Sequence, residues 1–188
     1  RTVFCEHIHE KGNQMADETD RLIVITGGPG AGKTSLIEAL AGSGHAVWPE
    51  AGRAIIRDQQ AIGGRGLPWV DPVLFAELML SSDLRGHAEA RAGQGNVFFD
   101  RGVPDIAGYL TLCGLPIPDH VERAAQQQRY RRTVFIAPPW RDIFTQDAER
   151  KQDFAEAQRT YAAMAATYPR YGYALIELPR VSVTERVS

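Results

Sequence analysis

Apolar residues occur along this chain either in short unbroken runs or at every third or fourth position of longer stretches. Unbroken runs predict strands buried on both faces, and the wider spacing predicts helices with one buried side. The predicted strands are residues 22–25, 45–48, 96–99, 133–137 and 173–177. The predicted helices are residues 36–40, 50–59, 72–92, 104–112, 119–130 and 152–168, with a further helical segment at the C-terminus. Such alternation predicts an α/β fold, with a five-stranded parallel sheet between two layers of helices.

A glycine-rich segment joins the first predicted strand to the first predicted helix and reads Gly-Gly-Pro-Gly-Ala-Gly-Lys-Thr at residues 27–34. It matches the pattern G-x-x-x-x-G-K-[ST], in which backbone N–H groups surround the phosphates of a nucleotide. Lys33 is expected to reach the β- and γ-phosphates, and the Thr34 hydroxyl to bind Mg²⁺. The expected nucleotide-binding residues are Gly28, Pro29, Gly30, Ala31, Gly32, Lys33, Thr34 and Ser35. The sequence therefore predicts a site for a purine nucleoside triphosphate, ATP or alternatively GTP, with Mg²⁺.

Acidic residues follow the second and third predicted strands. Asp100 follows an apolar strand, as a Walker B metal ligand does, and Arg101 beside it offers a planar group suited to phosphate or carboxylate. The alternative is a simple ion pair at the strand end. Glu50 lies where open α/β sheets bind ligands, although it could instead favour the start of the next helix and pair with Arg53 or Arg57.

A glycine-rich loop at residues 61–70 carries Trp69, which we interpret either as a substrate wall or lid, or as a buried aromatic plug. Asp71 is predicted to cap the helix that follows. The buried stripe expected for that helix is Leu74, Phe75, Leu78 and Met79. Residues 141–151 are polar and lack periodicity, so their basic residues, Arg150 among them, could move over the transferred phosphate or belong to a solvated loop.

Composition and charge narrow the class of protein. The chain has 188 residues, which fits one domain at 21–188 after a polar N-terminal tail at 1–20. Lys and Arg total 21 against 23 Asp and Glu, so no nucleic-acid partner is expected. No apolar run approaches the roughly 18 to 20 residues that a membrane span needs. Only two cysteines are present, Cys5 and Cys113, which favours a reducing, cytoplasmic compartment.

From residue 21 onward the chain resembles the kinase-like P-loop proteins labelled predicted AAA-type ATPases, a group similar to the ribosylnicotinamide kinase domain of NadR. The segments that carry the resemblance are the glycine loop at 25–34, Pro-Glu-Ala-Gly-Arg at 49–53, Leu-Pro-Trp-Val-Asp at 67–71, Phe-Phe-Asp-Arg-Gly at 98–102, Ala-Pro-Pro-Trp at 137–140, Asp-Ala-Glu-Arg-Lys at 147–151 and Tyr-Gly-Tyr near 171. The resemblance implies a three-layer α/β/α P-loop NTPase with strand order 2-3-1-4-5 and a helical lid around residues 140–151. It also implies that Asp100-Arg101 looks like the Asp-Arg pair of nucleoside and nucleotide kinases, where a strand-end carboxylate accepts the proton of the acceptor hydroxyl. Either Glu50 or Asp100 could be that base.

The leading hypothesis is transfer of the γ-phosphoryl group of ATP to a small hydroxylated or phosphorylated acceptor, nucleoside- or nucleotide-like. The expected catalytic residues are Lys33, Glu50, Asp100, Arg101 and Arg150, and the expected metal ligands are Thr34 and Asp100. The expected acceptor-binding residues are Glu50, Arg53, Trp69, Asp71 and Arg101. The last helical turn could form a wall for the base. The alternative is a nucleotide-dependent binding or regulatory module with weak or no kinase activity, whose cleft recognises a partner or an anionic lipid headgroup.

Overall fold

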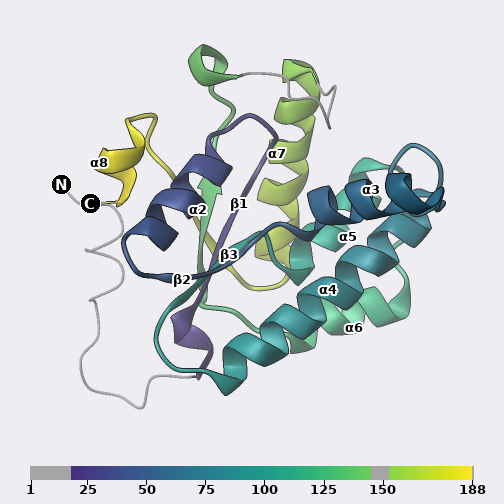
Figure 1. The fold of residues 1–188 in the computed structure, drawn as a ribbon, viewed down its shortest axis with the longest axis horizontal. Coiled ribbons are helices and arrows are strands. Elements are labelled where there is room, and N and C mark those ends of the chain that lie inside the picture. Colours follow the sequence, from purple (N-terminus) through teal and green to yellow (C-terminus); the bar gives the residue numbers. More distant parts are fainter. Residues whose placement is uncertain (1–17, 145–152, 188) are drawn as a thin grey trace.

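The fold is centred on one parallel sheet of five strands (Figure 1). The computed structural model describes residues 18–144 and 153–187, and the structural statements below concern that part of the chain. The strands are β1 Leu22–Gly27, β2 Ala46–Trp48, β3 Val97–Asp100, β4 Thr133–Ala137 and β5 Ala174–Glu177. Their order is β2-β3-β1-β4-β5 and every neighbouring pair is parallel, which confirms the predicted sheet and its strand order.

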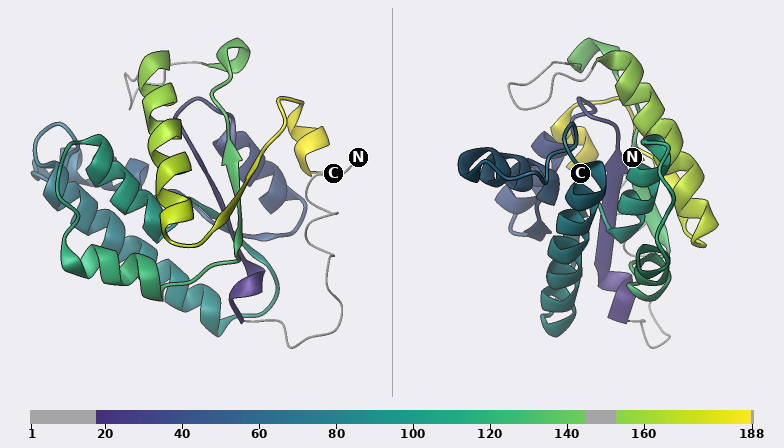
Figure 2. Two further views of the ribbon diagram at one scale, coloured as in Figure 1. Left: turned by 180° about the vertical axis from the view of Figure 1, so that it is seen from behind. Right: turned by 90° about the vertical axis from the view of Figure 1, so that its right-hand side faces the viewer.

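Helices cover both faces of this sheet, as the alternating pattern predicts. They are α2 Lys33–Gly42, α3 Ala51–Ile62, α4 Pro72–Ala92, α5 Val103–Leu112, α6 Asp119–Gln127, α7 Phe154–Arg170 and α8 Val183–Val187, with short 3-10 turns η1 Glu18–Arg21 and η2 Arg141–Ile143. Helix α2 packs on one face of the sheet and α7 on the other, which the front and back views show (Figure 1 and Figure 2). The result is a three-layer α/β/α arrangement.

Strand β1 lies in the middle of the sheet and divides its side chains between the two cores. Ile23 and Ile25 contact the layer of α2, whereas Leu22 and Val24 belong to the core formed with α4, α5, α6 and α7. All six residues of β1 are buried, which explains why the strand reads as an unbroken apolar run rather than an alternating one. Both cores therefore hold β1, and the loop that follows it starts from a fixed position.

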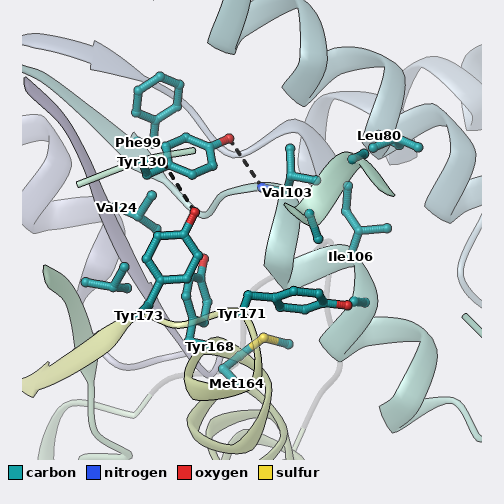
Figure 3. Close-up of a cluster of buried hydrophobic side chains, with 14 of the residues drawn as sticks. Val24, Leu80, Phe99, Val103, Ile106, Tyr130, Met164, Tyr168, Tyr171 and Tyr173 are labelled. Atoms are coloured by element: carbon teal, nitrogen blue, oxygen red, sulfur yellow. Dashed lines mark hydrogen bonds between the residues drawn. The ribbon is translucent and has the colours of Figure 1, made fainter. Parts of the chain in front are cut away.

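The core on the α7 side contains a group of aromatic residues (Figure 3). Tyr168 of α7 packs edge-on against Tyr173, with ring centroids 5.5 Å apart, and Tyr130 packs likewise on Phe99 at 5.2 Å. The hydroxyl of Tyr130 accepts a hydrogen bond from the backbone N–H of Val103 at 3.3 Å. Buried tyrosines need such partners, and this one joins the start of α5 to the core.

Several local expectations differ from the structure. Helix α6 ends at Gln127 instead of residue 130, because the chain must turn there to bury Tyr130 and enter β4. Helix α7 continues through Pro169 to Arg170, so the proline lies in the last turn and removes one backbone donor there. In α4 the expected stripe is only partly correct. Phe75 is buried in a cluster with Ile56 and Leu67, whereas Leu74 lies outside that cluster and is 38% exposed.

Candidate functional site

The glycine loop runs from the end of β1 into α2 and leaves no room for larger residues. Gly30 and Gly32 adopt positive φ angles of 67° and 77°, which favour glycine. A Cβ atom on Gly28 would lie 2.4 Å from the carbonyl oxygen of Ala157 in α7. Helix α2 then begins at Lys33, and no side chain of the described residues caps its first turn. The loop and the helix N-terminus therefore present backbone N–H groups in the arrangement that binds phosphate.

Lys33 is buried within this loop. The residue is only 6% exposed, and its Nζ donates a hydrogen bond to the Gly28 carbonyl at 2.7 Å. A compact cation held against the loop in this way can contact phosphate oxygens without a large movement of the backbone. Thr34 and Ser35 follow on the same helical turn and face a cavity of about 410 Å³.

Asp100 ends β3 directly beside β1, where it pairs in register with Ile25. The residue is 7% exposed, and its Oδ1 is buried without a hydrogen-bond partner among the described residues. Burial raises the pKa of Asp100 to about 6, while the nearby charge of Lys33 acts in the opposite direction. A buried carboxylate oxygen without a partner, beside the phosphate loop, has the chemistry of a Mg²⁺ ligand.

Arg101 connects two carboxylates next to Asp100. Its Nε lies 3.2 Å from Glu50 Oε1 and its Nη1 lies 3.1 Å from Asp105 Oδ1. Burial lowers the pKa of Arg101, but the charges of Glu50 and Asp105 outweigh it, so the pKa stays above its ordinary value. The other oxygen of Asp105 accepts hydrogen bonds from the Gly102 N–H, at 3.0 Å, and from the Tyr168 hydroxyl. This group fixes the position of Glu50 at the mouth of α3.

Two cavities meet at this group of charges. One, of about 410 Å³, is lined by the glycine loop together with Arg53, Trp140 and Arg186. The other, of about 450 Å³, lies beside Asp100 and Arg101 and has mainly apolar walls. Pro29 and Glu50 belong to the lining of both. The glycine loop and a neighbouring pocket thus open toward each other across Glu50.

The structure brings together most of the residues expected at the site, with three differences. Arg53 lines the cavity of the glycine loop instead of the second cavity, and its Nε is 4.0 Å from Glu50 Oε2. Asp71 does not line either cavity; it caps α4, accepting a hydrogen bond from the Leu74 N–H at 3.0 Å. Gly28 and Ala31 are buried within the loop and do not line its cavity. Arg150 lies outside the described residues.

Trp69 lines the second cavity but is 57% exposed, so it forms part of a wall and is not a buried plug. Phe144 and Phe154, which flank residues 145–152 in the sequence, lie close to the glycine loop. Their rings pack edge-on with centroids 5.4 Å apart. A Cβ atom on Gly30 would meet the Phe144 ring at 2.5 Å, so this aromatic pair lies against the loop.

Sequence reasoning missed five charged residues of the site, two of which, Glu156 and Arg159 of α7, line the second cavity. Asp83 of α4 lines the second cavity, and Asp105 of α5 holds Arg101. Arg186 of α8 is 1% exposed; its Nη1 donates to the Ala31 carbonyl at 3.3 Å, and its guanidinium lies 5.3 Å from the Trp140 ring centroid. Only Asp105 had a local signal, because it follows Arg101 by one helical turn and begins α5. The last helical turn does contribute Val183 and Arg186 to the wall of the glycine-loop cavity.

The parallel sheet with this strand order, the glycine loop entering α2 and the strand-end carboxylate beside it together define a kinase-like P-loop NTPase fold. The family model AAA_28, described as an AAA domain, matches residues 22–186. The chain therefore belongs to this family. No curated protein matches its sequence.

Solved structures agree with the fold. Deoxyadenosine kinase from M. mycoides with bound dATP superposes with a TM-score of 0.58 at 13% identity, covering 88% of this chain and 95% of that one. NadR protein in complex with NR gives 0.59 at 16% identity, covering 85% of this chain and 44% of that one. Shikimate kinase from Acinetobacter baumannii in complex with shikimate gives 0.51 at 16% identity, covering 90% of both. No helix of the described residues is long and apolar enough to cross a membrane.

Proposed function

We propose that the protein is a kinase that transfers the γ-phosphoryl group of ATP to a hydroxyl group of a small acceptor. The observation that carries this proposal is the meeting of the two cavities at Glu50 and Pro29. A phosphate-binding loop alone would serve any NTPase, but a second pocket next to the phosphate loop is what group transfer to an acceptor requires. The kinases among the structural neighbours are consistent with it.

On the nucleotide side, the glycine loop and the start of α2 would bind the phosphates, and Lys33 would move from the Gly28 carbonyl to the β- and γ-phosphates. Thr34 and the unpartnered Oδ1 of Asp100 would hold Mg²⁺, which neutralises charge on the phosphates when it is bound. The described residues contain no preformed group of three metal-binding side chains, so the nucleotide would provide further ligands. ATP is the proposed donor, with GTP as the alternative.

On the acceptor side, Glu50 would orient the acceptor hydroxyl and accept its proton. It lies between Arg101 and Arg53 and lines both cavities, so it can reach an acceptor hydroxyl from the side of the phosphates. Asp100 is the other candidate base, but a metal ligand is less available for proton transfer. Arg101 would stabilise charge on the transferring group, with Arg150 joining it from a lid around residues 140–151.

The test is phosphoryl transfer from labelled ATP to a panel of nucleosides, nucleotides and polyols, with nucleotide affinity measured in parallel by calorimetry. Glu50→Gln is expected to lower turnover at least a hundredfold while changing the ATP Kd less than threefold. Glu89→Gln, at an exposed position of α4, is the matched control and should behave as wild type. Tight ATP binding with no acceptor-stimulated turnover across the panel would refute the kinase and favour a nucleotide-dependent binding module.

A further inference from the structure

The second cavity, which we call the acceptor cavity, is acidic. Five carboxylates belong to its lining, and only two arginines do. The acidic residues are Glu50, Asp83, Asp100, Asp105 and Glu156, and the basic ones are Arg101 and Arg159. A pocket built for a phosphorylated or carboxylated acceptor needs the opposite balance, with cations free to contact the anion.

The arginine nearest the centre is already engaged. Arg101 bonds to both Glu50 and Asp105, at 3.2 Å and 3.1 Å, so its charge is shared by two carboxylates before any ligand enters. This leaves Asp100, which lies beside the glycine loop, Asp83 on the wall formed by α4, and Glu156 on α7. No hydrogen bond or ion pair links the Asp83 carboxyl to another side chain in the described part of the chain.

The groups around Asp83 show which sign of charge this part of the cavity disfavours. Burial, together with the charges of Asp105 and Glu50, raises its pKa to about 8, and the opposing charge of Arg101 is weaker. A position that disfavours one more carboxylate also disfavours a phosphate or carboxylate on a ligand. The same position favours a hydrogen-bond donor or a positive charge.

The remaining wall of the acceptor cavity is apolar and partly aromatic. Ile56, Phe75, Met79, Tyr109 and Met164 belong to it, with Trp69 near its entrance. Aromatic and thioether side chains around about 450 Å³ suit a flat ring and its attached hydroxylated group. In such a wall, a carboxyl that has no side-chain partner among the described residues, as Asp83 has none, favours ligands that can donate to it.

We propose that the acceptor is a ring-bearing, hydroxylated molecule without phosphate or carboxylate groups, and that it donates a hydrogen bond to Asp83 from an N–H or cationic group. This inference rests on the proposed function, because it names the class of molecule in that same cavity. It makes Asp83 a specificity-determining residue, separate from the groups that contact the transferred phosphate. A nucleotide monophosphate is excluded as the preferred acceptor.

The first experiment compares pairs of probes that differ in one anionic group. The pairs are adenosine and AMP, deoxycytidine and dCMP, and ribosylnicotinamide and its carboxylate analogue ribosylnicotinate. Binding is measured by calorimetry with the nucleotide site saturated by a non-hydrolysable ATP analogue and Mg²⁺, and phosphoryl transfer is measured separately with ATP. We expect at least one pair to bind, with the member lacking the anion preferred at least tenfold. Equal affinity, preference for the anionic member, or no binding by any pair at millimolar concentration overturns the proposal.

The second experiment replaces Asp83 itself. Asp83→Asn keeps the size and an acceptor oxygen but cannot release a proton to pair with a bound donor or cation, so the preferred probe should bind about tenfold more weakly and the discrimination within its pair should shrink. Glu89→Gln on the same helix should leave both unchanged. An unchanged affinity ratio in a folded Asp83→Asn variant overturns the role of Asp83, and the wild-type pairs test the charge preference even if that variant does not fold.

The two proposals fail in different ways. Discrimination in binding without phosphoryl transfer refutes the kinase and keeps the acidic acceptor cavity. Efficient phosphorylation of AMP or dCMP keeps the kinase and refutes the charge preference.

Discussion

Asp105 is the carboxylate on which the arrangement of the site depends, and its replacement by asparagine gives the sharpest test of that arrangement. The residue is 4% exposed and accepts hydrogen bonds from four groups. Oδ1 accepts from Thr26 and from Arg101, and Oδ2 accepts from the Gly102 N–H and from Tyr168. Every partner is a donor in the present arrangement, so a charged, acceptor-only group is required.

The size of the effect follows from what asparagine can and cannot replace. The carbonyl oxygen of asparagine can still accept the hydrogen bonds from Thr26 and Arg101. Its NH₂ group must then face the Gly102 N–H, which can only donate. One hydrogen bond to a charged partner is weakened and one buried backbone donor loses its acceptor, which together cost about 3 kcal/mol. Arg101 keeps its hydrogen bond to Glu50, so the loss of folding free energy is smaller than that of a fully broken ion pair. For a domain of this size, about 3 kcal/mol corresponds to a fall in Tm of roughly 6–12 °C.

The assay is urea unfolding followed by far-UV circular dichroism, with thermal scans of the same samples. Asp58→Asn, at an exposed position of α3, is the control and should change stability by less than about 0.5 kcal/mol. Because Arg101 would lose one of its two anchors, phosphoryl transfer should fall as well in the folded variant. A Tm within 2 °C of wild type, together with unchanged turnover, would show that Asp105 does not organise the site, contrary to the argument from its four donors.

Three further predictions concern the loop, the last helix and the acceptor cavity. Gly28→Ala should weaken ATP binding at least tenfold in calorimetry, because the new methyl group would lie 2.4 Å from the Ala157 carbonyl; an unchanged Kd would contradict this. Arg186→Gln should weaken ATP binding about tenfold and adenosine binding much less, because Arg186 lines the glycine-loop cavity and its buried Nη2 has no partner among the described residues; equal losses for both ligands would contradict it. The pKa of Asp83 is raised from 3.8 to about 8, so the folded protein keeps a proton that the unfolded chain has lost, and wild-type stability should fall as pH rises between these values. Relative to wild type, the free energy of unfolding of Asp83→Asn should therefore rise by up to about 1.4 kcal/mol per pH unit from pH 5 to pH 8 in urea unfolding. A difference between the two proteins that does not depend on pH would count against the raised pKa of Asp83.

The sequence predicted the part of the site that is local along the chain. The glycine loop is short, continuous and placed between a strand and a helix, so its geometry follows from its own residues. Asp100 was identifiable for a similar reason, since it directly ends an apolar strand. The sheet order came from the resemblance to kinase-like P-loop proteins, because hydrophobic periodicity predicts strands but says nothing of which strands are neighbours.

The other half of the site could not be predicted because it is assembled from helices that are distant in sequence. Asp83 and Asp105 are single acidic residues within helices, a pattern that usually marks a solvent-facing side. Only the packing of α4 and α5 against the sheet turns them toward the acceptor cavity and Arg101. Asp71 is the opposite case. Its place in a motif suggested substrate binding, but in the structure it caps α4 and lines neither cavity.

The backbone of Arg101 gives an independent reason to regard its side chain as essential to the site. Its φ of 76° is the only positive value among the described non-glycine residues, and such a conformation costs of order 1 kcal/mol. Glycine would remove that cost, and the Arg101 N–H would still donate to the Ile25 carbonyl at 3.0 Å. What glycine could not provide is the guanidinium that bonds to both Glu50 and Asp105. An arginine at a backbone position suited to glycine is therefore best explained by the work of its side chain, which is to hold Glu50 where the glycine-loop cavity meets the acceptor cavity.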